Sequence, residues 1–174
     1  VTTGNYYRNS KPPIPETVTD STGLVVFTKM DIETGQQVFL KKALMSNGSI
    51  WGHGAYLGPD FSAQYLHNLA VEVRNSLALQ KFNKDYTTLD KEQQESLVSQ
   101  THDFLALNRY NAESHILYYT RIETISFSEQ INYWRDYFQK PAGNRGLPAN
   151  LIVDQYELRQ LTAFFAWTAW ATTA

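Results

Sequence analysis

The strongest pattern in the sequence is a stripe of apolar side chains at helical spacing in its last third. The stripe, at i, i+4, i+7 and i+11, consists of Phe127, Ile131, Trp134 and Phe138. This spacing places all four side chains on one face of an α-helix, which needs a partner surface to cover it. Ser126 and Glu129 have the spacing of a capping box, so the helix is predicted to begin at Ser126.

Four further segments are predicted to be helices from their periodicity and their end signals. The first is capped by Thr28 or Asp31 and ends before Gly48, and the second has Pro59 in its first turn and continues through Leu77. The third covers residues 89–108, and the fourth begins near Asp154 and continues into the tail. The third of them is predicted to turn Leu97, Val98, Phe104 and Leu105 inward.

Runs of β-branched and aromatic residues predict a short strand at Leu24–Phe27 and a strand or hairpin between Ser114 and Thr124. Glycines punctuate residues 45–58, which are predicted to form a loop, and Pro141 to Pro148 form another. The predicted fold class is therefore mostly α, with a short strand pair or hairpin.

The composition excludes several classes of chemistry. The chain has 174 residues, which fits one domain, and it has no cysteine. Disulfides, thiolate metal ligands, a cysteine nucleophile and haem attachment through C-x-x-C-H are thereby excluded. A net charge of -2 gives no electrostatic footprint for nucleic acid. No run reaches the roughly 18 consecutive apolar residues that span a bilayer.

The two ends of the chain differ in character. Residues 1–20 are polar, and Pro12, Pro13 and Pro15 make them an extended arm. The last residues, FFAWTAWATTA, are apolar and rich in aromatic side chains. Such a density of tryptophan is typical of an interfacial aromatic belt or of a core helix cut short. On the first interpretation, four side chains are expected to be exposed: Phe164, Phe165, Trp167 and Trp170.

No motif in the chain identifies an active site. The spacing of the histidines does not place two metal ligands on one helix face. His53 is the most notable of them, because it lies between two glycines. Ser49 does not lie in G-x-S-x-G, and the glycines between Gly48 and Gly58 lack the lysine of a phosphate-binding loop. The residues alone predict a helical domain without recognisable catalytic groups.

Two stretches nevertheless resemble a known family. Residues 35–67, GQQVFLKKALMSNGSIWGHGAYLGPDFSAQYLH, are similar to the start of the extracytoplasmic domain of quinol-dependent nitric oxide reductases. So is the closing stretch, with GLPAN followed by DQYELRQLTAFFAWTAWA. These enzymes are the single-chain relatives of the haem-copper oxidases. The resemblance covers nearly the whole chain and is weakest between about residues 80 and 125.

A further resemblance, to the cytochrome c subunit of the two-subunit reductases, locates a lost haem site. There a C-x-x-C-H motif precedes G-x-G-A-Y, which matches Gly52 to Tyr56 here. Leu44, Asn47 and Gly48 then stand where the two cysteines and the histidine would be. The axial methionine is missing as well, because the chain's methionines are Met30 and Met45. The resemblance implies a cytochrome c-like helical domain lacking haem, with extra helices.

A small cytochrome that loses its haem needs other groups to fill the space. Aromatic side chains can each bury roughly 150–250 Å². The candidates for filling the vacated pocket are Trp51, Tyr56, Phe61, Tyr65 and Trp134.

The resemblance implies that the chain is the extracytoplasmic domain of a membrane enzyme that reduces nitric oxide to nitrous oxide with quinol, in denitrification or detoxification. Residues 1–20 would follow a removed membrane helix, and residues 164–174 would start the next. Haem b and non-haem iron would be bound by the missing membrane part, and the isolated domain, without cofactor, would be inactive. Its role would be to cap the membrane part and shape the approach of quinol. The expected interface residues are Tyr6, Tyr7, Trp51, His53, Tyr56, Leu57, Phe164, Phe165, Trp167 and Trp170.

Two alternatives stay open from the sequence. One is a free-standing small-molecule or protein-binding module, with His53 and Tyr56 in a ligand loop. The other is an electron carrier, which requires a bound haem.

The electron-carrier alternative has a direct spectroscopic test. Because the residues that attach and ligate haem are missing, we expect a colourless protein when the chain is produced with a haem-maturation system. The measurement is the visible absorption spectrum of the purified chain. A Soret band would contradict the haem-free interpretation.

Overall fold

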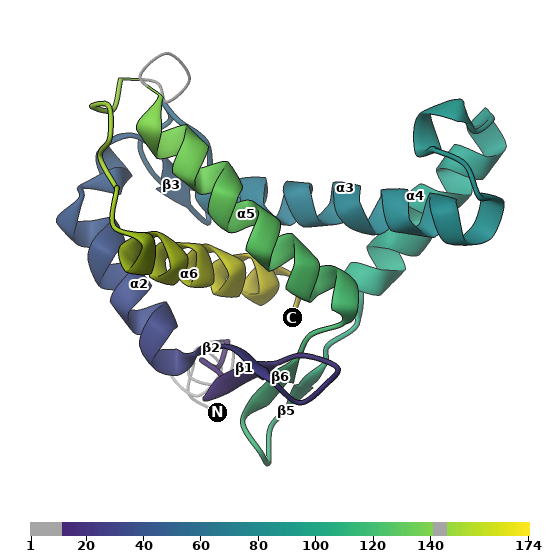
Figure 1. Cartoon of the computed structure of the whole chain (residues 1–174), viewed down its shortest axis with the longest axis horizontal. Coiled ribbons are helices and arrows are strands. Elements are labelled where there is room, and N and C mark those ends of the chain that lie inside the picture. The colour runs from purple at the N-terminus through teal and green to yellow at the C-terminus, as the bar shows by residue number, and fades with distance from the viewer. Residues whose placement is uncertain (1–11, 141–145) are drawn as a thin grey trace, which may run out of the picture.

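The computed structural model describes residues 12–140 and 146–174 (Figure 1). Its helices are α2 (Lys29–Lys41), η1 (Leu44–Ser46), α3 (Phe61–Phe82), η2 (Tyr86–Thr88), α4 (Lys91–Ala106), α5 (Arg121–Gln139) and α6 (Gln155–Thr173). Its strands are β1 (Thr17–Thr19), β2 (Val25–Thr28), β3 (Ser49–Ile50), β4 (His53–Gly54), β5 (Tyr110–Asn111) and β6 (Ile116–Tyr118). The prediction of a mostly α fold with minor strand content is confirmed. The first part of the predicted arm and most of the loop predicted at residues 141–148 lie outside the described residues.

Helix α6 forms the centre of the core, in contact with α2, α3 and α5 (Figure 1). The side chains of its middle turns are buried, including Leu161, Phe164 and Phe165. A helix that is apolar all round is a core helix. The expectation that Phe164 and Phe165 are exposed is therefore wrong, because the neighbouring helices cover both rings.

The strands form two small sheets. In the larger sheet the order is β2-β1-β6-β5, with β1 parallel to β6 and the other pairs antiparallel. Strands β5 and β6 form the hairpin predicted after Ser114, although it begins earlier, at Tyr110. The second sheet is the short β3–β4 hairpin, which lies within the segment predicted as a loop.

Side-chain caps define where the helices begin. Thr28 and Asp31 form a capping box for α2, and Asp154 caps α6 as predicted. Helix α3 begins after Asp60, so Pro59 precedes the helix instead of lying in its first turn.

The prediction that α5 begins at Ser126 is wrong. Thr120 and Glu123 form the capping box that is used, and the helix begins at Arg121. Ser126 is buried in the second turn, where its hydroxyl accepts a hydrogen bond from Gln130 Nε2 at 3.0 Å. The apolar stripe itself is confirmed, since three of its members, Phe127, Trp134 and Phe138, are fully buried.

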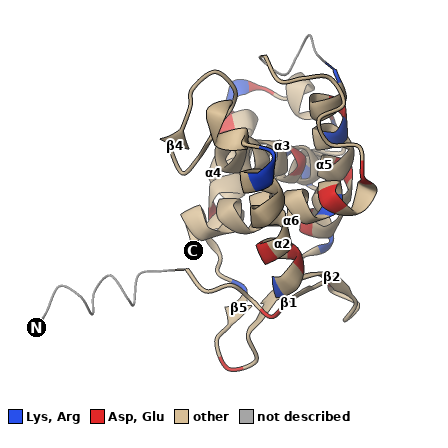
Figure 2. Ribbon diagram, turned by 90° about the vertical axis from the view of Figure 1, so that its left-hand side faces the viewer, with Lys and Arg blue, Asp and Glu red and all other residues tan. Residues whose placement is uncertain are grey.

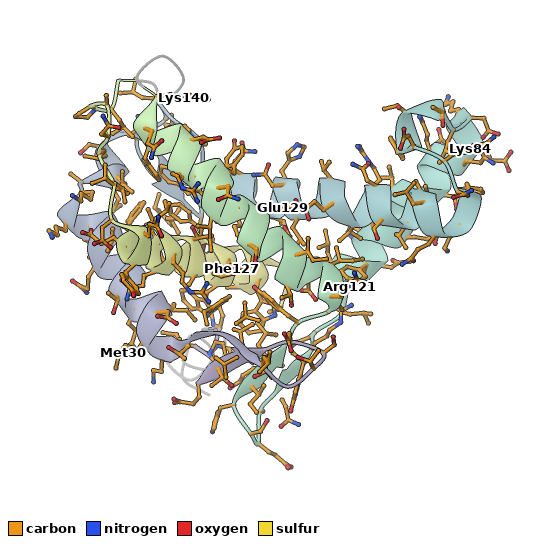
Figure 3. All side chains as sticks on the ribbon, in the orientation of Figure 1. Met30, Lys84, Arg121, Phe127, Glu129 and Lys140 are labelled. Carbon is orange, nitrogen blue, oxygen red and sulfur yellow. The ribbon has the colours of Figure 1, made fainter. Side chains whose placement is uncertain are left out.

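The far half of α3 and helix α4 form a hairpin that projects from the body of the molecule (Figure 1), with Lys84 at its tip (Figure 3). The hairpin has its own small core of Ala78, Leu89 and Leu97. Val98 was predicted to point inward, but it is exposed, because Leu97 is the residue of α4 that enters this core. Among the described residues, no helix is long and apolar enough to cross a membrane.

Helices α2 and α6 make the most extensive contact in the molecule, and Gly35 is where their backbones come closest. A Cβ atom at Gly35 would overlap the carbonyl oxygen of Gln160 on α6. That oxygen belongs to helix backbone, so it cannot move without shifting α6.

We expect Gly35→Ala to lower the free energy of unfolding by about 1–3 kcal/mol, because overpacking outweighs the higher helix propensity of alanine. Urea unfolding of the purified chain measures the change. Leu40→Ala, at an exposed position on the same helix, is the control and should change stability by less than about 0.5 kcal/mol. Equal stability of the two variants would contradict the close contact.

Candidate functional site: the Trp51 loop and its cavity

Residues 44–60 form a loop that is held together by the carboxylate of Asp60. Its Oδ2 accepts hydrogen bonds from Ser49 Oγ at 2.9 Å and from the Gly52 backbone N–H at 2.7 Å. Its Oδ1 accepts from the Ala63 N–H at 2.9 Å, which caps α3, and from the Ser62 hydroxyl. One side chain thus fixes both the β3–β4 hairpin and the start of a long helix.

These hydrogen bonds keep Asp60 ionised. Partial burial acts to raise the pKa of this carboxyl, but hydrogen bonds from Ser62, Ala63, Gly52 and Ser49 outweigh burial, and the pKa of Asp60 is lowered. The negative charge also lies at the N-terminus of α3, where the helix dipole favours it.

Trp51 links this loop to α6. Its backbone is in the left-handed region, with φ of 51°, which is uncommon for a residue with a bulky side chain. The indole Nε1 donates to the carbonyl oxygen of Thr168 at 2.8 Å, and the ring packs against Trp167 with centroids 5.7 Å apart. Trp167 in turn donates from Nε1 to the carbonyl oxygen of Pro13 at 2.9 Å. The two tryptophans therefore join the start of the described chain, the loop and the last helix.

A cavity of about 480 Å³ lies beside the two tryptophans. Its lining is mostly apolar and comes from the arm, α2, the loop and α6: Pro12, Ile14, Ile32, Gln36, Met45, Ile50, Trp51, His53, Phe164, Trp167 and Thr168. Gln36 and His53 offer hydrogen-bonding groups. An adjacent hollow is lined by Pro12, Trp51, Ala171 and Thr172, so both described ends of the chain meet at this surface.

Three of the four segments that line the cavity carry no charged residue. Residues 12–15, 43–59 and 160–174 contain no Asp, Glu, Lys or Arg. In Figure 2 the ribbon at β4 and at the C-terminal end of α6 accordingly carries neither blue nor red. Met45, Trp51 and Leu57 are exposed here. We call this surface, formed by the three uncharged segments, the tryptophan face.

Of the ten residues that the sequence indicated for an interface, the structure brings four together at the cavity: Trp51, His53, Phe164 and Trp167. Trp51 and Trp167 are in contact, and His53 lines the cavity with them. Tyr56 is 80% exposed, with its hydroxyl donating to the Gly52 carbonyl, and it does not line the cavity. Trp170 is half-buried against Tyr110, on another part of α6. Leu57 is exposed on the loop, and Tyr6 and Tyr7 lie outside the described residues.

The residues that the resemblance places at an attachment motif do not fit a haem. Leu44 and Asn47 are buried, and Asn47 Oδ1 accepts a hydrogen bond from the Tyr137 hydroxyl at 3.1 Å. A Cβ atom at Gly48 would overlap the carbonyl oxygen of Pro59 and the ring of Phe61. Without cysteine there is no thiol for a thioether bond. Met45 and Met30 are both exposed side chains.

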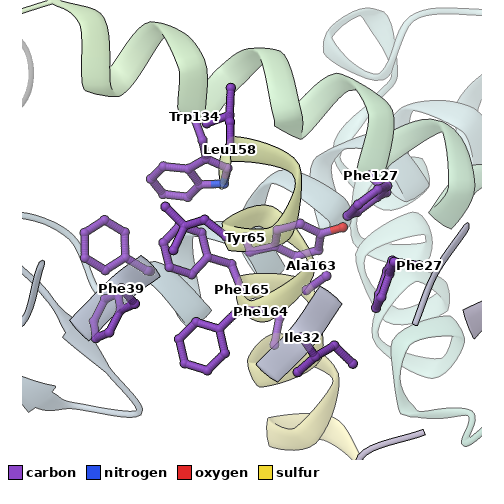
Figure 4. Packing of buried hydrophobic residues seen from close by; sticks show 14 of the residues in the cluster. Phe27, Ile32, Phe39, Tyr65, Phe127, Trp134, Leu158, Ala163, Phe164 and Phe165 are labelled. Atoms are coloured by element: carbon purple, nitrogen blue, oxygen red, sulfur yellow. The ribbon is translucent and has the colours of Figure 1, made fainter. Parts of the chain in front are cut away.

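Aromatic rings occupy the core that these residues border (Figure 4). Phe61 stacks on Phe165 with centroids 4.9 Å apart and planes 4° from parallel, and Trp134 packs against Phe165 at 4.9 Å. Of the five predicted filling residues, Phe61, Tyr65 and Trp134 are buried. The prediction is wrong for Trp51 and Tyr56, because the hairpin turns both side chains to the surface.

A second polar cluster, which sequence reasoning missed, lies between α3 and α5. Glu72 is hydrogen bonded to Glu129 and Ser126, and burial together with Glu129 raises the pKa of Glu72 to about 8. In Figure 3, Phe127 and Glu129 lie on opposite sides of α5, with Glu129 on the side of α3. The cluster offers too few ligands for a metal, and the described part of the chain holds no group of three His, Cys, Asp or Glu side chains that could bind one.

Next to this cluster, the hydroxyls of Tyr65 and Tyr119 are hydrogen bonded to each other. Burial raises the pKa of both phenols, so they are neutral at physiological pH. The spacing of these residues along the chain gives no signal for the contact, because it joins α3 to the segment after β6.

The fold is a mostly helical domain, and buried side chains close the position at which the resemblance places a haem-attachment motif. A family model described as the NorB cytochrome c-like domain of nitric oxide reductase matches residues 15–174, and the chain belongs to this family. No curated protein matches the chain.

The role of Asp60 can be tested through pH. Asp60→Asn keeps the size of the side chain but removes the charge and one acceptor oxygen, so we expect it to lower the free energy of unfolding by about 1–2 kcal/mol at neutral pH. Since the folded-state pKa of Asp60 is lowered, its contribution is present above its ordinary pKa and is lost as the pH falls through the folded value.

The difference between Asp60→Asn and the unchanged chain should therefore shrink as the pH falls below about 4. Denaturant unfolding at a series of pH values measures it. Asp85→Asn, which alters a carboxylate without a capping hydrogen bond, is the matched control. A difference that stays constant with pH would show that the charge of Asp60 does not matter.

Proposed function

We propose that the chain is the extracytoplasmic domain of a single-chain, quinol-dependent nitric oxide reductase. In the parent enzyme, membrane helices would hold the haem b and non-haem iron that reduce nitric oxide. This domain would bind no cofactor and would be inactive by itself. Its part would be to cover the membrane portion and to shape the path by which quinol reaches it.

The tryptophan face is the observation that carries the proposal. A domain joined to membrane helices at both ends needs both ends on the side that meets the membrane. Pro12, the first described residue, lines one hollow with the last turn of α6, and this arrangement supports the proposal. The same face lacks charged side chains, and tryptophan side chains are enriched at membrane interfaces, where one end of the ring system is apolar and the other is wet.

The closed haem position supports quinol as the electron donor. A reductase that takes electrons from a soluble cytochrome needs a haem relay in its extracytoplasmic part. Quinol arrives through the bilayer and needs none. In this chain Leu44, Asn47 and Gly48 stand at the attachment motif, and aromatic rings fill the core beside them.

The proposal predicts that the loop contributes to turnover with quinol. In the full-length enzyme, Trp51→Ala removes the contacts to Thr168 and Trp167, so the loop loses its position on α6. We expect a several-fold loss of quinol-dependent nitric oxide reduction and a higher KM for quinol. His53→Ala and Tyr56→Ala test the cavity lining and the exposed loop separately.

Met30→Ala is the matched control, because Met30 is an exposed apolar residue on α2 that does not line the cavity. Haem content of the membrane part and turnover with an artificial electron donor should be unchanged in every variant. Quinol-dependent turnover equal to the control in all three loop variants would refute the interface proposal.

The cavity also favours a second candidate function, a binding module for a small apolar molecule. Its volume and lining fit such a ligand, with Gln36 and His53 as polar contacts. Gene context separates the two: apolar helices encoded on both sides of the chain support the reductase domain, and a stop codon after Ala174 supports the module.

A further inference from the structure

A groove between α5 and α6 holds two arginines whose charges are not paired within the described residues. Arg135 and Arg159 line it, together with Ile131, Gln155, Tyr156 and Leu158, and it encloses about 370 Å³. In residues 12–140 and 146–174 neither guanidinium takes part in an ion pair. The remaining residues, 1–11 and 141–145, contain no Asp or Glu that could supply one.

The hydrogen bonds of the two arginines leave donors unused. Arg135 donates from Nη2 to Asn132 Oδ1, while its Nε is buried and has no hydrogen-bond partner in the described part of the chain. A buried N–H without an acceptor is costly, so the Arg135 side chain gains stability if it turns this group toward an acceptor in the groove. Arg159 donates from Nη2 to the carbonyl oxygen of Val26, and its guanidinium lies 5.4 Å from the ring of Phe127. These contacts hold Arg159 in place without neutralising its charge.

We propose that this groove binds an oxyanion of the carboxylate or phosphate type. Guanidinium groups present planar sets of donors that match both anions, and two of them on neighbouring helices can hold one anion between them. Tyr156 and Gln155 supply further polar groups at the rim. Asp136 and Glu157 are neighbours in sequence, but neither lines the groove.

The groove is separate from the tryptophan face. From Arg159 to Thr172 the rise along α6 is about 20 Å. The site therefore stands independently of the proposed function, and its failure would leave the tryptophan face untouched. An anion bound here would join α5 to α6 at the end of the core where α6 begins.

The test is calorimetric titration of the purified chain with inorganic phosphate and with acetate at low ionic strength. We expect saturable binding of one anion per chain that weakens as salt is added. Arg135→Gln and Arg159→Gln should each weaken it about tenfold or more, since each removes charged hydrogen bonds. Arg135→Lys keeps the charge but loses the planar donors, so its affinity should fall between that of Arg135→Gln and that of the unchanged chain.

Arg74→Gln is the control, because Arg74 lies on α3 with its guanidinium 3.9 Å from the ring centroid of Tyr86, away from the groove. It should bind as the unchanged chain does. Circular dichroism confirms that each variant is folded. If Arg135→Gln does not fold, the anion affinities of Arg135→Lys and Arg159→Gln are compared with that of the unchanged chain instead.

A second arm distinguishes a free anion from a lipid headgroup, using vesicles of phosphatidylcholine with and without phosphatidylglycerol. Binding of phosphate or acetate in solution assigns a free anion. Binding only to vesicles with phosphatidylglycerol, weakened in the groove variants, assigns a headgroup. No binding in either arm, or binding that the groove variants leave unchanged, would overturn the proposal.

Discussion

The contact between Phe61 and Phe165 is the interaction on which the rest of the structure depends. The two rings stack 4.9 Å apart and join the first turn of α3 to the middle of α6. Trp134 from α5 and Phe39 from α2 each contact both rings of this pair. Four helices thus meet at one group of rings, and burial of aromatic surface of this size dominates the energetics of a small core.

This group of rings also determines what the loop before α3 can do. Because the ring of Phe61 lies directly beneath Gly48, the backbone at the attachment motif is pressed against the core and no side chain fits there. Asp60, one residue before Phe61, then fixes the hairpin by hydrogen bonds to its backbone and to Ser49. The close packing at Gly48 and the presentation of Trp51 at the surface are therefore consequences of one packing arrangement.

The sequence predicts the helices well, because their apolar periodicity is local. It predicts their ends less well. Both Thr120 with Glu123 and Ser126 with Glu129 have capping-box spacing, but only the first pair caps α5, which begins soon after β6. The burial of Phe164 and Phe165 likewise depends on three helices that are distant in sequence. Resemblance places Trp51 and His53 in one loop, but their meeting with Trp167 across the cavity is a tertiary contact that spacing cannot reveal.

Helix α6 gives the domain one charged end and one uncharged end. Its first turns carry Glu157 and Arg159, and after Gln160 no charged residue follows. The middle turns of α6, around Phe164 and Phe165, are buried, so the helix cannot rotate without breaking the core. Under the proposed function, the uncharged end faces the membrane and the arginine groove faces water. The aromatic core would then serve to hold that orientation, since it fixes α6 against α2, α3 and α5.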